Sequence, residues 1–170
     1  MRPLKVLTTH PTPHGFTAPP RGWNSFGLQI NPMLNPSFTY NQQSVVQQAE
    51  NLVKIVPPSR LKESDYYISL DSGWSVGDHG DNHGRIIFDK TKFDLPALAD
   101  HLHSQNLKLG VYVLPGSFEK DGDKFIAGTN IRIKETWSGN NNGFSRIDFD
   151  FQKSGVQQYH DSVVELFAKW

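Results

Sequence analysis

The sequence contains no cysteine, which excludes a disulfide framework, a thiol nucleophile and a thiolate metal site. It also lacks an excess of either charge, because 17 basic residues balance 17 acidic ones and the pI is about 7.1. That balance argues against a nucleic-acid or anionic-membrane surface as the main partner. No apolar run approaches the roughly 20 residues that span a bilayer, so no membrane partner is expected.

Residues 1–20 are rich in proline and predict an irregular lead-in. They contain no apolar stretch of the kind found in a secretory signal peptide, so an intracellular location is favoured. Residues 21–170 suffice for one domain with a real core but hardly for two. Aromatic residues make up 12% of this polar chain, a composition that fits sugar stacking and ordinary core packing equally well.

Strand-like and helix-like segments alternate along residues 21–170. Strands are expected at Arg21–Asn24, Tyr66–Leu70 and Leu107–Val113, with a further short one at Ile147–Phe151. Helices are expected from a Ser44 cap to Pro57–Pro58, around Leu95–Gln105 with Asn106 as terminator, and at Ser154–Trp170. The pattern loosens between Leu114 and Ser145. The alternation predicts an α/β fold with parallel strands and right-handed crossovers.

Polar and aromatic residues stand where these strands end. Asp71 and Trp74 follow the second strand, Trp23 lies in the first, and Tyr112 lies near the end of the third. Parallel α/β folds bind ligands at the carboxyl ends of their strands, so these four side chains are expected to face one pocket. The alternatives are that Asp71 caps the next turn and that the tryptophans belong to the core.

Two other groups of titratable residues carry weaker signals. The stretch DHGDNHG at residues 78–84 holds two acids and two histidines, but its spacing matches no zinc signature and its glycines suit a turn. Asp148 and Asp150 share one face of a strand, as a glycosidase pair would, yet they are interpreted as structural. Neither a metal nor another cofactor is expected.

Four stretches in order carry a resemblance to a known family. They are PPRGWNSFG, YYISLDSGWS, the segment from GRIIFDKTKFD to LKLGVYV, and the closing VQQYHDSVVELFAKW. Together they resemble the N-terminal part of the catalytic barrel of family-27 glycoside hydrolases, the α-galactosidase family of clan D. In that family the matching text runs Pro-Pro-Met-Gly-Trp-Asn-Ser, then a strand ending in Asp-Asp-Cys-Trp, then Leu-Lys-Leu-Gly-Ile-Tyr.

The resemblance implies a (β/α)8 TIM barrel, of which the first three or so βα units are readable here. A full barrel takes about 250 residues. Residues 21–170 are therefore expected to be the N-terminal portion of a glycosidase catalytic domain, truncated before strand four. The family uses a retaining mechanism with a nucleophile after strand four and an acid/base after strand six. Both catalytic carboxylates are thus expected beyond Trp170.

The resemblance also assigns substrate-binding residues. Trp23, Trp74 and Tyr112 match pocket aromatics, and Asp71 matches the first acid of the Asp-Asp pair that binds sugar hydroxyls. Ser72 stands in place of the second acid. A carboxylate accepts hydrogen bonds at roughly twice the strength of a neutral acceptor, so this change is expected to weaken selection for galactose.

The leading functional hypothesis is a fragment of a retaining glycoside hydrolase acting on α-linked terminal sugars. The alternative is a non-catalytic carbohydrate-binding α/β protein that uses Trp23, Asp71 and Trp74. A flavodoxin-like domain that binds a phosphorylated ligand is disfavoured, because no glycine-rich phosphate loop follows the first strand. In the first two cases the partner is a carbohydrate.

Overall fold

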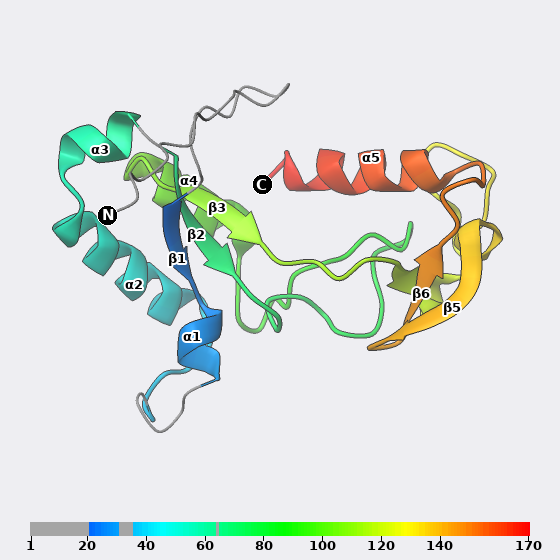
Figure 1. Ribbon diagram of the computed structural model, residues 1–170, viewed down its shortest axis with the longest axis horizontal. Helices are drawn as coiled ribbons and strands as arrows, with labels where there is room; N and C mark the ends of the chain where they lie inside the picture. Colours follow the sequence, from blue (N-terminus) through cyan, green and yellow to red (C-terminus); the bar gives the residue numbers. More distant parts are fainter. Residues whose placement is uncertain (1–20, 31–35, 64) are drawn as a thin grey trace, which may run out of the picture.

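The computed structural model describes residues 21–30, 36–63 and 65–170, so the predicted lead-in at 1–20 lies outside the described residues. The first half contains β1 (Arg21–Asn24), α1 (Phe26–Gln29), α2 (Gln42–Ile55), α3 (Pro58–Glu63), β2 (Tyr66–Leu70), α4 (Leu95–Ser104) and β3 (Lys108–Val111). The second half contains β4 (Ser117–Phe118), the 3-10 helices η1 (Glu119–Asp121) and η2 (Ile133–Thr136), β5 (Trp137–Gly143), β6 (Arg146–Phe149) and α5 (Val156–Phe167). Figure 1 shows these two halves side by side, with α5 extending between them.

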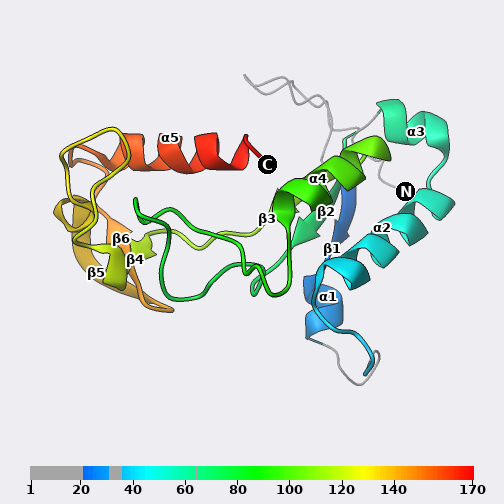
Figure 2. The ribbon, with the colours of Figure 1, turned by 180° about the vertical axis from the view of Figure 1, so that it is seen from behind.

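The first half is built on a parallel sheet in the order β1-β2-β3. Trp23 pairs with Ile68, which in turn pairs with Leu109. The predicted parallel strands are therefore confirmed, although β3 is shorter than the apolar run at Leu107–Val113 suggested. Helices α2 and α4 cover one face of this sheet, as the view from behind shows (Figure 2).

The backbones of β1 and β2 approach each other closely at Gly22. Gly22 has φ of +147°, a conformation that side chains disfavour, and a Cβ built there would lie 1.8 Å from the Tyr67 carbonyl oxygen. Only glycine lets these two strands come so close.

Helix α2 begins two residues before the predicted cap. Asn41, with extended backbone, accepts a hydrogen bond from the Ser44 N–H through its side chain at 3.0 Å. The prediction that Ser44 caps the helix was wrong, because Asn41 is an equally good capping residue and stands earlier. The helix ends at Ile55 and Pro58 opens α3, which the sequence reading missed; proline suits a first helical turn.

Helix α4 has caps that fit its sequence at both ends. The Asp94 side chain accepts a hydrogen bond from the Ala97 N–H at 3.2 Å, and Pro96 lies in the first turn. Leu95, Leu98 and Leu102 are fully buried against the sheet. Asn106 has φ of +59°, which confirms the predicted left-handed terminator.

The second half contains an antiparallel sheet in the order β4-β6-β5, which the sequence reading did not predict. The expected short strand at Ile147–Phe151 corresponds to β6, but its partners are neighbours in sequence and not the parallel strands. β5 was missed because its sequence WSGNNNG is polar and mostly exposed, so no apolar alternation marks it. Only part of the chain therefore follows the parallel α/β pattern.

Two hydrophobic cores hold the two halves. The larger lies between the parallel sheet, α2 and α4, and the smaller contains Ile126, Ile133, Phe149, Val156 and Tyr159. Helix α5 contributes to both, since Val156 and Tyr159 are buried in the smaller core while Phe167 packs against the larger one, as does Trp170 after the helix ends. It is shorter than the predicted Ser154–Trp170. Among the described residues, no helix is long and apolar enough to cross a membrane.

Candidate functional site

The carboxyl ends of β1, β2 and β3 meet at one edge of the parallel sheet. The Ser25 hydroxyl, just after β1, accepts a hydrogen bond from the Asp71 N–H at 2.8 Å. The Tyr112 N–H donates to the Leu70 carbonyl at 2.8 Å. Three segments distant in sequence are thereby joined at the point where a parallel α/β fold binds ligands.

Asp71 is half-buried, and its carboxylate has a local partner. One oxygen, Oδ1, accepts a hydrogen bond from the Ser72 N–H at 2.8 Å, which is the turn-capping interaction considered from the sequence. The Tyr40 hydroxyl donates to the Asp71 carbonyl at 2.8 Å. Burial raises the pKa of Tyr40 to about 12, so this phenol stays a neutral donor.

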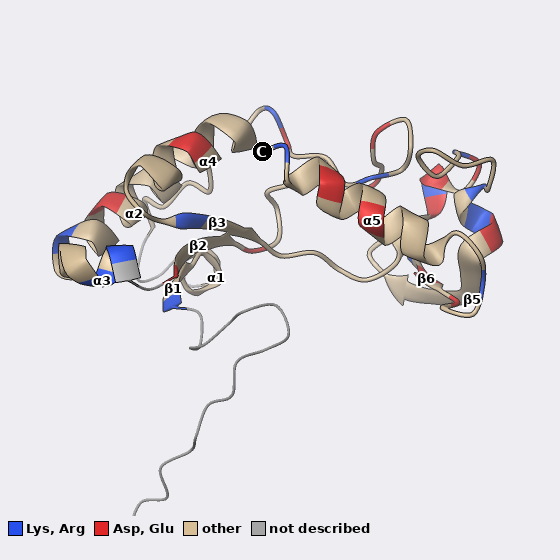
Figure 3. Ribbon diagram, turned by 90° about the horizontal axis from the view of Figure 1, so that it is seen from above, with Lys and Arg blue, Asp and Glu red and all other residues tan. Residues whose placement is uncertain are grey.

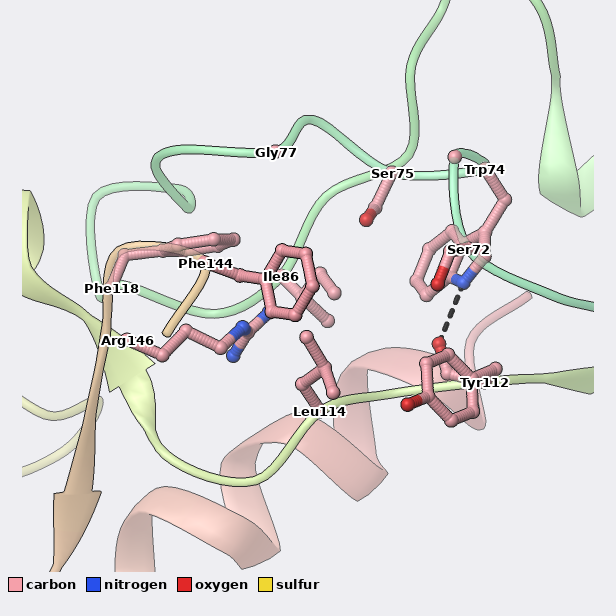
Figure 4. Close-up of a pocket in the computed structure, with 11 residues that line it drawn as sticks. Ser72, Trp74, Ser75, Gly77, Ile86, Tyr112, Leu114, Phe118, Phe144 and Arg146 are labelled. Atoms are coloured by element: carbon pink, nitrogen blue, oxygen red, sulfur yellow. Dashed lines mark hydrogen bonds between the residues drawn. The ribbon is translucent and has the colours of Figure 1, made fainter. Parts of the chain in front are cut away.

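A pocket of about 270 Å³ lies between this edge and the antiparallel sheet. Its lining residues are Ser72, Gly73, Trp74, Ser75, Gly77, Ile86, Tyr112, Leu114, Phe118, Phe144 and Arg146. Figure 4 shows Ser72, Trp74 and Tyr112 on one side of the pocket and Arg146 entering from the other. The pocket thus brings together three of the five predicted site residues, and Trp23 and Asp71 are outside its lining.

Trp74 is both a core residue and a wall of the pocket. It is 1% exposed, and its indole Nε1–H donates to the Tyr112 carbonyl at 2.7 Å (Figure 4). Its ring packs in a T-shaped arrangement with Phe167 and with Trp170, each with a centroid distance of 6.2 Å. The hydrogen bond ties the loop after β2 to the end of β3 and leaves only the apolar part of the indole for a ligand.

Trp23 and Tyr112 differ in how much of each side chain is exposed. Trp23 is half-buried on β1 and packs against the larger core. Tyr112 is 44% exposed, and its hydroxyl points toward Leu114 in the pocket (Figure 4). Of the predicted aromatic residues, Tyr112 therefore offers the most accessible surface.

The sequence reading missed the far wall of the pocket. Arg146 is only 6% exposed, its guanidinium carbon lies 4.1 Å from the centre of the Phe118 ring, and Nη1 donates to the Gly116 carbonyl at 2.9 Å. Burial lowers the pKa of Arg146, while electrostatic interactions with Tyr159 and Asp121 oppose this, and an arginine keeps its charge in either case. A basic residue in the alternating RIDF was the available signal.

The remaining titratable residues are engaged elsewhere. Asp81 pairs with Arg85 at 2.6 Å, and Asp78 contacts Lys120 and His79. Asp148 Oδ1 accepts from the Asn142 side chain at 2.7 Å, and Asp150 caps a turn through the Gln152 N–H. Within the described residues, no three His, Asp or Glu side chains are grouped so that they could hold a metal.

Comparison with known proteins identifies relatives of this chain. The chain is 44% identical to α-galactosidase 3 of Hypocrea jecorina, over 99% of this chain and 28% of that protein. It is 31% identical to human α-N-acetylgalactosaminidase, over 59% of this chain and 24% of that protein. The homologues of this chain are α-galactosidases and related enzymes of glycoside hydrolase family 27. The resemblance read from the sequence is confirmed.

The family-27 relatives also include solved structures. A β-L-arabinopyranosidase of this family from Geobacillus stearothermophilus, in complex with arabinose, superimposes with a TM-score of 0.72 at 22% identity. The match covers 89% of this chain and 38% of that one, and these structural neighbours are TIM-barrel enzymes. The chain thus spans about a quarter to two fifths of the length of the relatives it matches. No protein-family model matches the chain.

Proposed function

We propose that a polypeptide carrying this chain is a retaining glycoside hydrolase acting on terminal α-linked sugars. In this proposal residues 21–170 supply the first three βα units of a (β/α)8 catalytic barrel, with the antiparallel sheet as a wall added after β3. The observation that carries the proposal is the parallel sheet β1-β2-β3 with a pocket at its carboxyl edge, in a chain homologous to α-galactosidases.

The proposed substrate-binding residues are Trp23, Asp71, Ser72, Trp74 and Tyr112. Asp71 supplies a charged acceptor through the carboxylate oxygen that the Ser72 N–H does not occupy. Trp74 supplies an apolar wall, and Tyr112 an exposed ring with a hydroxyl donor. Sugars combine an apolar ring face with many hydroxyl groups, so such a mixture of aromatic and polar groups suits them.

The 170-residue chain by itself is predicted not to hydrolyse aryl α-galactosides or α-glucosides. No carboxylate is among the pocket-lining residues. Asp148 already accepts a hydrogen bond from the Asn142 side chain, and Asp150 already caps a turn. Covalent retaining chemistry needs two carboxyl groups about 5–5.5 Å apart across the glycosidic bond. The measurement is release of the aryl group by the purified chain. Turnover that disappears in Asp150→Asn would show that a catalytic carboxylate lies within these residues.

The test of the proposal itself uses the longer polypeptide, in which Ser72→Asp is predicted to increase the preference for galactosides over glucosides. A new charged acceptor is worth about 1.5–3 kcal/mol, or roughly 10- to 150-fold in kcat/KM. Asp71→Asn is predicted to remove most activity, while its amide oxygen still accepts from the Ser72 N–H and preserves the turn.

The matched control is Ser154→Asp, which adds the same charge at an exposed position outside the pocket lining. It should leave the ratio of kcat/KM for galactosides to kcat/KM for glucosides unchanged. If wild type already prefers galactosides strongly and Ser72→Asp does not move the ratio, Ser72 has no part in selection. If the longer polypeptide binds sugars but never cleaves them, the chain is a carbohydrate-binding protein.

A further inference from the structure

Arg146 is a buried cation whose hydrogen-bond and ring partners are uncharged. It is 6% exposed, donates one hydrogen bond to the Gly116 carbonyl and stacks over the Phe118 ring. A guanidinium carries five N–H donors, so a single carbonyl leaves most of them unused. Burying a charge without a partner is costly, which makes such a residue a candidate for ligand recognition.

Asp121 acts on Arg146 through its charge but forms no ion pair with it. Asp121 is ion-paired with Lys124 at 2.5 Å, and Asp81 with Arg85 at 2.6 Å. Each of these acids already has another cation as its ion-pair partner. The segment from Tyr112 to Phe118, which supplies Tyr112, Leu114 and Phe118 to the pocket, has no charged residue, and Figure 3 draws the connection after β3 in tan, the colour of uncharged residues. Among the lining residues, Arg146 is the one with a full charge.

The turn that delivers Arg146 to the pocket is strained. β5 and β6 are joined by Phe144 and Ser145, with φ of +53° and +58°. Such two-residue turns favour asparagine and glycine, and a phenylalanine there is an outlier. Phe144 and Arg146 both line the pocket, and Phe144 is 77% exposed. Strain of this kind is kept where it positions functional side chains.

We propose that this pocket binds a glycoside that carries a carboxylate group, of the uronic acid type, with the carboxylate paired to the Arg146 guanidinium. The Phe144 ring covers an apolar face of the same sugar. An arginine and a carboxylate match in geometry and can form two parallel hydrogen bonds. This inference rests on the proposed function, because it takes the pocket to be a sugar site, and it names the substrate class that the site selects.

The experiment measures the binding of D-galacturonate, D-galactose and acetate to the purified 170-residue chain. Chemical shifts of the Trp74 indole N–H and of the arginine Nε–H groups report occupancy, since Trp74 and Arg146 line opposite sides of the pocket. We expect galacturonate to bind about 10-fold or more tightly than galactose, because a charged hydrogen bond adds about that factor. This preference should shrink as ionic strength rises from about 0.02 M to about 0.5 M.

Three variants locate the effect. Arg146→Gln should bring the two sugars to within about twofold of each other, and Arg146→Lys should keep part of the preference, because lysine retains the charge without the planar fork. Arg132→Gln is the matched control: Arg132 also stacks over a phenylalanine ring, at 4.7 Å from Phe125, but lies outside the pocket lining. It should bind as wild type does.

Equal binding of galactose and galacturonate by wild type would overturn this inference and leave the proposed sugar site intact. A preference that survives in Arg146→Gln, or that shows no dependence on salt, would also overturn it. Acetate that binds as tightly as galacturonate, or no binding of any of the three, would overturn both the inference and the sugar site. The salt dependence in wild type is informative even if Arg146→Gln folds poorly.

Discussion

Replacing Asp121 with alanine is expected to lower the free energy of unfolding by about 3–5 kcal/mol. The Asp121 side chain is 1% exposed, pairs with Lys124 at 2.5 Å and accepts the Gly80 N–H through Oδ2 at 2.6 Å. Alanine would leave that N–H buried without a partner and Lys124 without its counter-charge. Asp121 is the buried member of this pair and Lys124 is 31% exposed, so the substitution removes the group that the surrounding donors are built to satisfy, which costs far more than the pair is worth.

The measurement is denaturant unfolding followed by tryptophan fluorescence. Asp123→Ala is the matched control, because Asp123 is an acid in the same loop that pairs with Lys134 at 2.6 Å while remaining 78% exposed. Exposed pairs contribute little, so the control should unfold with the wild-type midpoint. If both variants lose stability equally, burial is not what makes the Asp121 pair important.

Replacing Gly22 with alanine is expected to be at least as damaging, with a loss of about 4 kcal/mol or more. The new Cβ would lie 1.8 Å from the Tyr67 carbonyl oxygen, far inside any real contact, and 2.7 Å from the Tyr67 nitrogen. Both are backbone atoms, so the clash can only be relieved by moving β1 away from β2. The backbone at φ of +147° would add further strain.

Gly27→Ala is the control for this prediction. Gly27 lies in α1 without a neighbour near its Cβ position, and alanine favours a helix, so its stability should be unchanged or slightly higher. Hydrogen exchange of the β2 amides gives the second readout. A Gly22→Ala chain with wild-type protection in β2 would mean that the strands stay paired and accommodate the added Cβ, which would contradict the prediction.

The parallel half of the fold was predictable from sequence because its physical signals are local. Tyr66–Leu70 is a short apolar run, and β2 begins and ends at the same two residues. Asn106 terminates α4 as its chemistry suggests. The cap of α2 shows the limit of such reasoning, since Asn41 and Ser44 are both good capping residues and the sequence does not choose between them.

The antiparallel half was not predictable by the same means. The polar strand β5 is stabilised by its pairing with β6 and not by burial of its own side chains, so no periodicity identifies it. Because the antiparallel sheet was not predicted, the pocket residues that it carries were missed as well. Ser72, Trp74 and Tyr112 could be placed by strand-end reasoning, but Phe144 and Arg146 belong to the turn between β5 and β6 and to β6, which line the other side of the pocket.

The length of helix α5 sets the separation between the two walls of the pocket. Its first turns are seated in the smaller core through Val156 and Tyr159, and Phe167 near its end meets Trp74 beside the pocket. At 1.5 Å per residue its 12 residues span about 18 Å. One added residue would turn everything after it by about 100°, so both ends could not stay seated. The width of the pocket is thus coupled to the length and angular phase of one helix that contributes no side chain to its lining.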